Sequence, residues 1–194
     1  MLTQDLISKA VKIIERGGVV IHPTDTCYGL AANVFDKTAV AKIYKLKGRD
    51  FNKPVIFCVR DFAMAEKLVD FNSLAKLLFD KFLPGPLTLV LPSKINPGKK
   101  DSIRIPNHPV ILALSRICSV PFTTTSANLS GGPNPYSISE IPDAIKNNVD
   151  LILDVGTLPK NLPSTVIEVT DEEFKILRGG PVSQAEIRRA LSAL

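Results

Sequence analysis

Proline and glycine interrupt this chain more often than a mostly helical protein would tolerate. There are 15 prolines and 11 glycines among its 194 residues. Proline lacks a backbone N–H and clashes with the preceding helical turn, and glycine loses more conformational freedom than other residues when a helix forms. We therefore expect a strand-rich fold whose loops have defined shapes.

Helices are predicted where apolar residues recur at helical spacing. Leu6, Ala10 and Ile13-Ile14 predict a helix over residues 4–16, which Gly17-Gly18 would end. Residues suited to open further helices are Asp36, Asp61, Asn72 or Ser73, Pro109, and Ser183 with its Ser-Gln-Ala-Glu capping box.

Short apolar and β-branched runs predict the strands, at residues 19–21, 54–59, 87–91, 102–105, 121–125, 151–155, 165–169 and 174–177. Because helices and strands mix without strict βαβ alternation, we expect an α+β fold with a mixed sheet. No repeat, low-complexity tract or linker divides the sequence, so one domain over residues 1–194 is expected.

Composition argues against several classes of protein. The N-terminus has no basic segment followed by an apolar one, so no signal peptide is expected, and no apolar run approaches the ~18 residues that span a bilayer. Three scattered cysteines suit a reducing compartment, so a cytoplasmic protein without membrane contact is expected. The net charge of +5 either favours anionic partners such as nucleotides, pyrophosphate or RNA, or simply gives a basic surface.

Three polar clusters stand beside predicted strands and helices, although the P-loop, GxGxxG and kinase motifs are absent. Residues 23–30 (PTDTCYGL) follow a buried strand, residues 45–49 (KLKGR) end a helix, and residues 123–132 (TTTSANLSGG) hold five hydroxyls. The first cluster can be explained as a capped turn, and the second as cations that the dipole favours at a helix C-terminus. The density of donors in the third favours phosphate or carboxylate binding. Arg104, in an otherwise apolar strand, requires an anionic partner.

In this order the clusters resemble the YrdC-like family of threonylcarbamoyl-AMP synthases. The resemblance runs from about residue 14 to residue 180 through PTDTCYGL, KGR, PGPLT, IRIPNHP, TSANLSG, STV and LRGG. It implies a three-layer domain in which helices flank a twisted mixed β-sheet. Since the chain ends shortly after LRGG, it resembles the short, single-domain members of the family.

The resemblance also implies a reaction and its partners. The family converts L-threonine, bicarbonate and ATP, normally with Mg²⁺, into L-threonylcarbamoyl-adenylate and pyrophosphate. A downstream threonylcarbamoyl-transferase complex then modifies adenosine 37 of tRNA (the t6A modification), so a contact with RNA or tRNA is a further expectation. No residue of the sequence identifies a metal site.

The same resemblance assigns roles to residues. The catalytic tetrad falls on Lys47, Arg49, Ser126 and Asn128. The threonine-binding residues would be Thr26, Cys58, Arg104, Ser126 and Ser164. The ATP-binding residues would be Arg49, Lys53, Asn128, Tyr136 and Arg178. Supporting hydroxyls would come from Thr24, Thr125 and Thr165.

Three positions depart from the family pattern, and they affect the site more than the fold. Asp50 and Lys53 stand where many members have Pro and Asn, and Cys58 stands where some have His. A carboxylate at Asp50 could weaken the neighbouring phosphate clamp or bind magnesium.

Two other functions fit parts of the sequence. A basic concave face of such a fold could hold double-stranded RNA through its phosphates, in which case salt would control binding and Ser126 or Asn128 would matter little. A related enzyme could adenylate another carbamoyl compound, such as carbamoyl phosphate, and would differ only in the threonine pocket.

Overall fold

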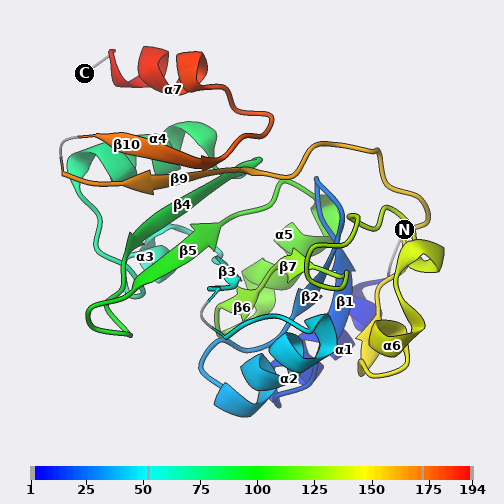
Figure 1. Cartoon of the computed structure of the whole chain (residues 1–194). Coiled ribbons are helices and arrows are strands. Elements are labelled where there is room, and N and C mark those ends of the chain that lie inside the picture. Colours follow the sequence, from blue (N-terminus) through cyan, green and yellow to red (C-terminus); the bar gives the residue numbers. More distant parts are fainter. Residues whose placement is uncertain (1–2, 52, 172, 193–194) are drawn as a thin grey trace.

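The chain folds into two mixed β-sheets with helices packed against them (Figure 1). The structure is a computed structural model that describes residues 3–51, 53–171 and 173–192. The strands are β1 (Val20–Pro23), β2 (Tyr28–Ala31), β3 (Ile56–Cys58), β4 (Leu87–Pro92), β5 (Lys100–Arg104), β6 (Phe122–Thr123), β7 (Thr125–Ser126), β8 (Leu151–Ile152), β9 (Thr165–Val169) and β10 (Phe174–Arg178). The helices are α1 (Gln4–Glu15), α2 (Lys37–Lys47), α3 (Phe62–Ala65), α4 (Ser73–Phe82), α5 (Pro109–Ile117), α6 (Asp143–Lys146) and α7 (Gln184–Leu191), with a 3₁₀ turn over Ile138–Glu140.

The sheets combine parallel and antiparallel pairs. One has the order β7-β2-β1-β8, with β8 parallel to β1, and the other has the order β10-β9-β4-β5-β3-β6, in which β4–β9 and β5–β3 are parallel. The expected α+β class with mixed pairing is therefore confirmed. The strands are divided between two hydrogen-bonded sheets.

Strand β1 is buried on both faces, which explains its unbroken apolar run. Side chains alternate across a strand, so Val20 joins the cluster of α1 and α5, whereas Ile21 joins the cluster that contains Ile43 of α2. Each fully buried aliphatic side chain of this kind contributes about 1.5–3 kcal/mol. The result is a helix–sheet–helix sandwich around the four-stranded sheet.

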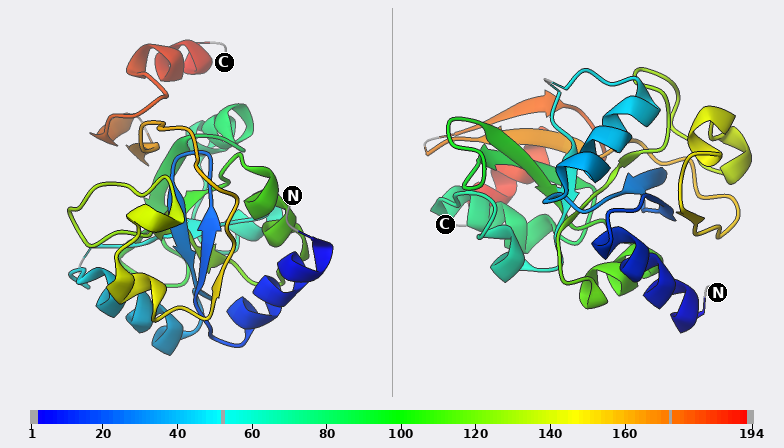
Figure 2. Two further views of the ribbon diagram at one scale, coloured as in Figure 1. Left: turned by 90° about the vertical axis from the view of Figure 1, so that its right-hand side faces the viewer. Right: turned by 90° about the horizontal axis from the view of Figure 1, so that it is seen from below.

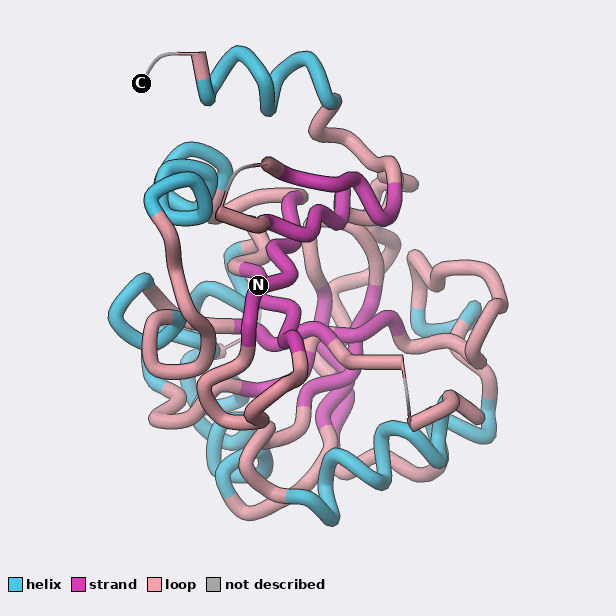
Figure 3. Tube along the Cα trace, turned by 60° about the vertical axis from the view of Figure 1, so that its left-hand side comes forward, coloured by secondary structure: helices cyan, strands magenta, loops and turns pink. Residues whose placement is uncertain are grey.

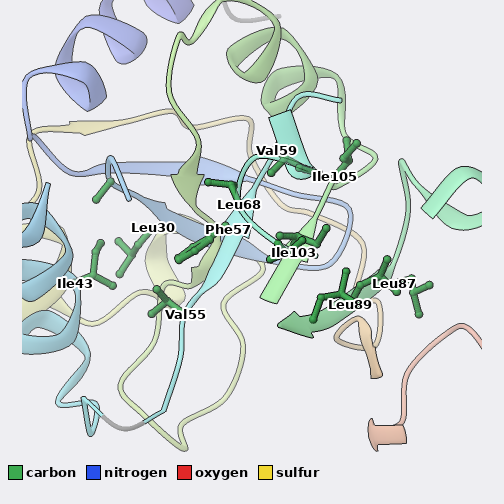
Figure 4. Close-up of a cluster of buried hydrophobic side chains, with 14 of the residues drawn as sticks. Leu30, Ile43, Val55, Phe57, Val59, Leu68, Leu87, Leu89, Ile103 and Ile105 are labelled. Atoms are coloured by element: carbon green, nitrogen blue, oxygen red, sulfur yellow. The ribbon is translucent and has the colours of Figure 1, made fainter. Parts of the chain in front are cut away.

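The core continues without a break into the six-stranded sheet (Figure 4). Phe57 of β3, Leu89 of β4 and Ile103 of β5 belong to the same buried cluster as Leu30 and Ile43. Helices α4 and α7 contact each other and lie at the end of the molecule away from α1 and α2, as Figures 1, 2 and 3 show.

Helix starts follow the expected caps. The side chains of Asp36, Asp61 and Asn72 accept hydrogen bonds from backbone N–H groups in the first turns of α2, α3 and α4, and Ser183 forms the expected capping box of α7. Such a cap is typically worth about 1 kcal/mol. Among the described residues, no helix is both long and apolar enough to span a bilayer.

Several strand predictions differ from the structure. The predicted strand at 121–125 is two strands, because the chain leaves the six-stranded sheet after Thr123 and joins the other sheet at Thr125. The strands expected at 54–59 and 151–155 are shorter, and β2 and α6 were not predicted. Short elements carry too few residues for a periodic pattern, so pairing and packing decide them.

Candidate active site

A pocket of about 110 Å³ opens where the two sheets meet. Residues of the four-stranded sheet and its loops line one wall, and residues of β3, β5 and the ends of β9 and β10 line the other. The lining residues are Thr24, Thr26, Cys27, Gly29, Arg49, Pro54, Ile56, Arg104, Thr124, Thr125, Ser126, Asn134, Pro163, Ser164 and Arg178. The segments that meet here are far apart in the sequence, so the sheets position the site.

The pocket is electropositive. Arg49, Arg104 and Arg178 all line it, and the lining given above contains no Asp or Glu. Hydroxyl and amide groups make up much of the remaining polar surface. Guanidinium groups offer planar forks of donors that match phosphate and carboxylate oxygens. The site is therefore suited to an anionic ligand with several oxygen atoms.

Arg104 has the anionic partner that the sequence required. Its Nη2 lies 2.6 Å from Asp25 Oδ1, its Nε donates to Gly85 O at 3.0 Å, and its Nη1 donates to Thr26 Oγ1 at 3.3 Å. Burial lowers the pKa of Arg104, whereas Asp25 opposes that shift. A guanidinium has five N–H groups, so two remain for a ligand.

Lys47 lies beneath the pocket and outside its lining. It is 2% exposed, and its Nζ donates to Asn128 O at 2.9 Å, to Asn128 Oδ1 at 3.0 Å and to Ser126 O. Burial, and then the nearby Arg49, lower the pKa of Lys47 to about 8. A cation held in this way fixes the loop that follows β7.

The Ser126–Asn128 loop is also tied to itself. Ser126 Oγ donates to Asn128 Oδ1 at 2.6 Å, and Asn128 Nδ2 donates to Gly132 O at 2.6 Å. Ser126 lines the pocket, whereas Asn128 lies outside the lining. Three members of the tetrad named from the sequence are thus joined by hydrogen bonds: Lys47, Ser126 and Asn128.

Arg49 reaches the pocket from the end of α2. Gly48 ends this helix in the left-handed conformation, with φ of 55°. Arg49 then donates from Nε to Lys53 O at 3.1 Å and from Nη2 to Pro54 O at 3.0 Å. The backbone of the 49–54 loop therefore orients the guanidinium.

Arg178 and Ser164 lie side by side and form one end of the pocket. The register of β10 shifts between Ile176 and Arg178, and such an irregularity re-aims a side chain. Arg178 donates to Ser164 O from Nε at 3.1 Å and from Nη2 at 2.8 Å, and Nη2 also donates to Ser164 Oγ at 3.0 Å. Burial, followed by the charge of Arg104, lowers the pKa of Arg178.

Gly180 allows this end of the pocket to form. A Cβ there would lie 2.4 Å from both Pro163 O and Thr165 N, which are backbone atoms beside Ser164. At Gly179 a Cβ would meet no atom within 4 Å. The second glycine of the LRGG element is therefore required by close packing of two backbone segments.

Besides Lys47 and Asn128, four residues expected at the site from the sequence lie outside the lining. Cys58 is 1% exposed, and burial raises the pKa of its thiol. Tyr136 donates from its hydroxyl to Asn161 O at 3.1 Å, and Lys53 contributes its backbone oxygen to Arg49. Thr165 Oγ1 bonds to the backbone of Val182. Thr24 and Thr125, the other expected supports, do line the pocket.

The structure adds residues that the sequence reasoning did not single out, among them Cys27, Thr124 and Asn134. Burial raises the pKa of Cys27 to about 11, so the thiol is neutral at pH 7. Thr124 is 6% exposed, and its Oγ1 has no hydrogen-bond partner in the described chain. A buried hydroxyl without a partner at a pocket wall is suited to bind a ligand.

The lining offers little to a metal ion by itself. Within the described residues, no group of three or more His, Cys, Asp or Glu side chains could hold a metal. Asp50, a metal-binding candidate from the sequence, is outside the lining. Mg²⁺ commonly enters sites together with substrate phosphates and keeps several waters. The residues present therefore fit a metal that arrives with a nucleotide.

Comparisons with known proteins agree on one family. A family model named Sua5/YciO/YrdC, with the description "Telomere recombination", matches residues 12–180. A protein of Methanocaldococcus jannaschii, provisionally named threonylcarbamoyl-AMP synthase, is 43% identical over 92% of this chain and 87% of its own. The Pyrococcus abyssi threonylcarbamoyl-AMP synthase is 35% identical over 95% of this chain, which spans 57% of that protein's length.

A solved structure shows the same relationship. The crystal structure of Pyrococcus abyssi Sua5 complexed with L-threonine superposes with a TM-score of 0.91 at 33% identity. The superposition covers 98% of this chain and 58% of that one. The likeness therefore extends over nearly all of the fold described above.

Proposed function

The chain belongs to the Sua5/YciO/YrdC family, and from this premise we propose that it is an L-threonylcarbamoyladenylate synthase. It would form threonylcarbamoyl-AMP and pyrophosphate from L-threonine, bicarbonate and ATP. The observation that carries the proposal is the convergence of Arg49, Arg104 and Arg178 with a row of hydroxyls on one pocket. A triphosphate and an amino-acid carboxylate both need such a surface.

The part of the pocket around Arg104 suits threonine. Threonine is a zwitterion with a hydroxyl, so its site needs a cation and neutral hydrogen-bonding groups. The two unused N–H groups of Arg104 would receive the carboxylate, and Thr26 and Ser164 are hydroxyls of the same lining. Asp25 keeps Arg104 in place.

The other two arginines of the pocket suit the phosphates of ATP. Arg49 and Arg178 would hold phosphate oxygens, and Ser126 would orient the reactants from the loop fixed by Lys47 and Asn128. When bound with the nucleotide, Mg²⁺ would neutralise phosphate charge. We place the metal with the nucleotide because the lining contains hydroxyls and no carboxylate.

The chemistry follows from positioning and charge. The threonine amine and bicarbonate give a carbamate and water. A carbamate oxygen then bonds to the α-phosphorus while the bond from that phosphorus to the bridging oxygen of pyrophosphate breaks. Cations and preorganised donors stabilise the charge that spreads over the phosphate oxygens. No side chain needs to form a covalent intermediate.

Pyrophosphate release tests the proposal. The assay omits ATP, threonine and bicarbonate in turn. We expect pyrophosphate to be released only when all three are present. Arg49→Ala should lower the rate by about 10²–10³-fold, the typical cost of one preorganised donor. Arg60→Ala is the matched control, because Arg60 pairs with Asp61 outside the pocket. Turnover without threonine or bicarbonate would favour adenylation of another carbamoyl compound.

The product would pass to a threonylcarbamoyl-transferase complex that acts on tRNA. We place the expected RNA contact on the outer side of α1, where Lys9, Lys12 and Arg16 border a surface hollow of about 440 Å³. Binding through phosphates would weaken steeply with salt and would be insensitive to Arg49→Ala. Binding of that kind without pyrophosphate release would favour an RNA-binding module.

A further inference from the structure

Thr88 is a buried hydroxyl one layer behind the pocket. It lies on β4 next to β9, is 0% exposed, and is absent from the pocket lining. Its Oγ1 is 2.9 Å from the Oγ of Ser164, which does line the pocket. Within the described chain this is the one side-chain hydrogen bond that Thr88 makes.

The direction of that hydrogen bond follows from counting protons. A hydroxyl has one proton and two acceptor positions. If Ser164 donated to Thr88, the Thr88 proton would be left without an acceptor in the core, which is costly. With Thr88 as the donor, its proton is accepted by Ser164, and the proton left over is that of Ser164, which lines the pocket and can meet a ligand there. The burial of Thr88 therefore fixes it as the donor.

Ser164 then has both acceptor positions occupied. Thr88 donates into one, and Arg178 Nη2 donates into the other at 3.0 Å. No described residue accepts from Ser164 Oγ in another direction. Its proton is left for the pocket, so Ser164 can only donate to a bound ligand.

We propose that Thr88 is a positioning residue that makes Ser164 an obligate hydrogen-bond donor, so that this end of the pocket selects a carboxylate oxygen. The selection of an acceptor rests on the geometry alone. Its identification with the carboxylate of threonine rests on the proposed function. Thr88 of the PGPLT element would thus affect ligand binding through Ser164, although Thr88 itself lies outside the pocket lining.

The test compares Thr88→Val, which keeps the shape and removes the hydroxyl, with Thr88→Ser, which keeps the hydroxyl. We expect Thr88→Val to raise the KM for threonine about tenfold. The kcat and the KM for ATP should change less than twofold, and Thr88→Ser should behave as the wild type. Thr123→Val is the control, because Thr123 is equally buried and lies outside the pocket lining.

Binding titrations identify the ligand group. Thr88→Val should weaken L-threonine about tenfold but leave 1-amino-2-propanol, which is threonine without its carboxylate, nearly unchanged. The proposal would be overturned if Thr88→Val lost the same affinity for both ligands or kept its affinity for threonine. It would also be overturned if Thr88→Ser bound threonine as weakly as Thr88→Val. Threonine binding without pyrophosphate release would refute the synthase function while leaving this test intact. Absence of threonine binding in the wild type would overturn both.

Discussion

Replacement of Lys47 by methionine tests whether a buried cation holds the site together. Two effects on stability oppose each other. In the wild type, burial lowers the pKa of Lys47 from 10.5 to about 8, so keeping the side chain charged costs about 3 kcal/mol of folding free energy. Lys47→Met removes this cost but takes a donor from three oxygens, at about 1–3 kcal/mol each. The midpoint of the second effect is about 6 kcal/mol, so a net loss of about 3 kcal/mol is expected.

Activity should fall much further than stability. The variant would remain folded at pH 7, since domains of this size are typically stable by about 5–15 kcal/mol. The loop of Ser126 and Asn128 would no longer be anchored, so we expect pyrophosphate release to fall about 100-fold or more in the folded protein. Urea denaturation at pH 7 and rates at saturating substrate separate the two effects.

The pH dependence gives the sharper result. Between pH 8 and 10.5 the folded protein binds fewer protons at Lys47 than the unfolded chain, because the pKa is lower in the folded state. The free energy of unfolding therefore rises with pH in this window, by at most about 1.4 kcal/mol per unit. Lys47→Met lacks this rise, so the stability gap between wild type and variant should widen by about 3 kcal/mol. Neutral Lys47 has only two protons for three acceptors, so wild-type activity should decline above pH 8.

A constant stability gap from pH 7 to pH 10 would refute the reasoning, because it would mean that Lys47 titrates normally. Retention of activity by the folded Lys47→Met protein would show that the loop needs no anchor. The difference between the two proteins is the quantity to measure, since burial raises the pKa of Cys27 to about 11 and that thiol titrates in an overlapping range.

Two further substitutions test the walls of the pocket. Asp25→Asn removes the charge beside buried Arg104 and should lower the free energy of unfolding by about 3 kcal/mol in urea, as expected when a buried pair loses one member. A loss below about 1 kcal/mol would contradict a buried ion pair. Gly180→Ala should weaken threonine binding at least tenfold, because its Cβ would press on the backbone beside Ser164. Gly179→Ala is the matched control and should bind normally.

The sequence by itself determined the helix caps, the need of Arg104 for an anionic partner, and the family. Caps such as Asp36 and Asn72 act within one helical turn, so they could be read directly from neighbouring residues. Arg104 in an apolar strand required an anionic partner whatever the fold, and that inference is confirmed. The order of the motifs also sufficed to indicate the family.

The tertiary structure decided which groups face a ligand. Thr123, Thr124 and Thr125 look equivalent in sequence, yet the crossing between sheets leaves Thr124 with an unpartnered hydroxyl at the pocket. Lys47 looks like a solvated helix end but is buried beneath the loop. These outcomes depend on contacts between residues about 80 positions apart, and local periodicity carries no information about such pairings because they arise when separate elements pack.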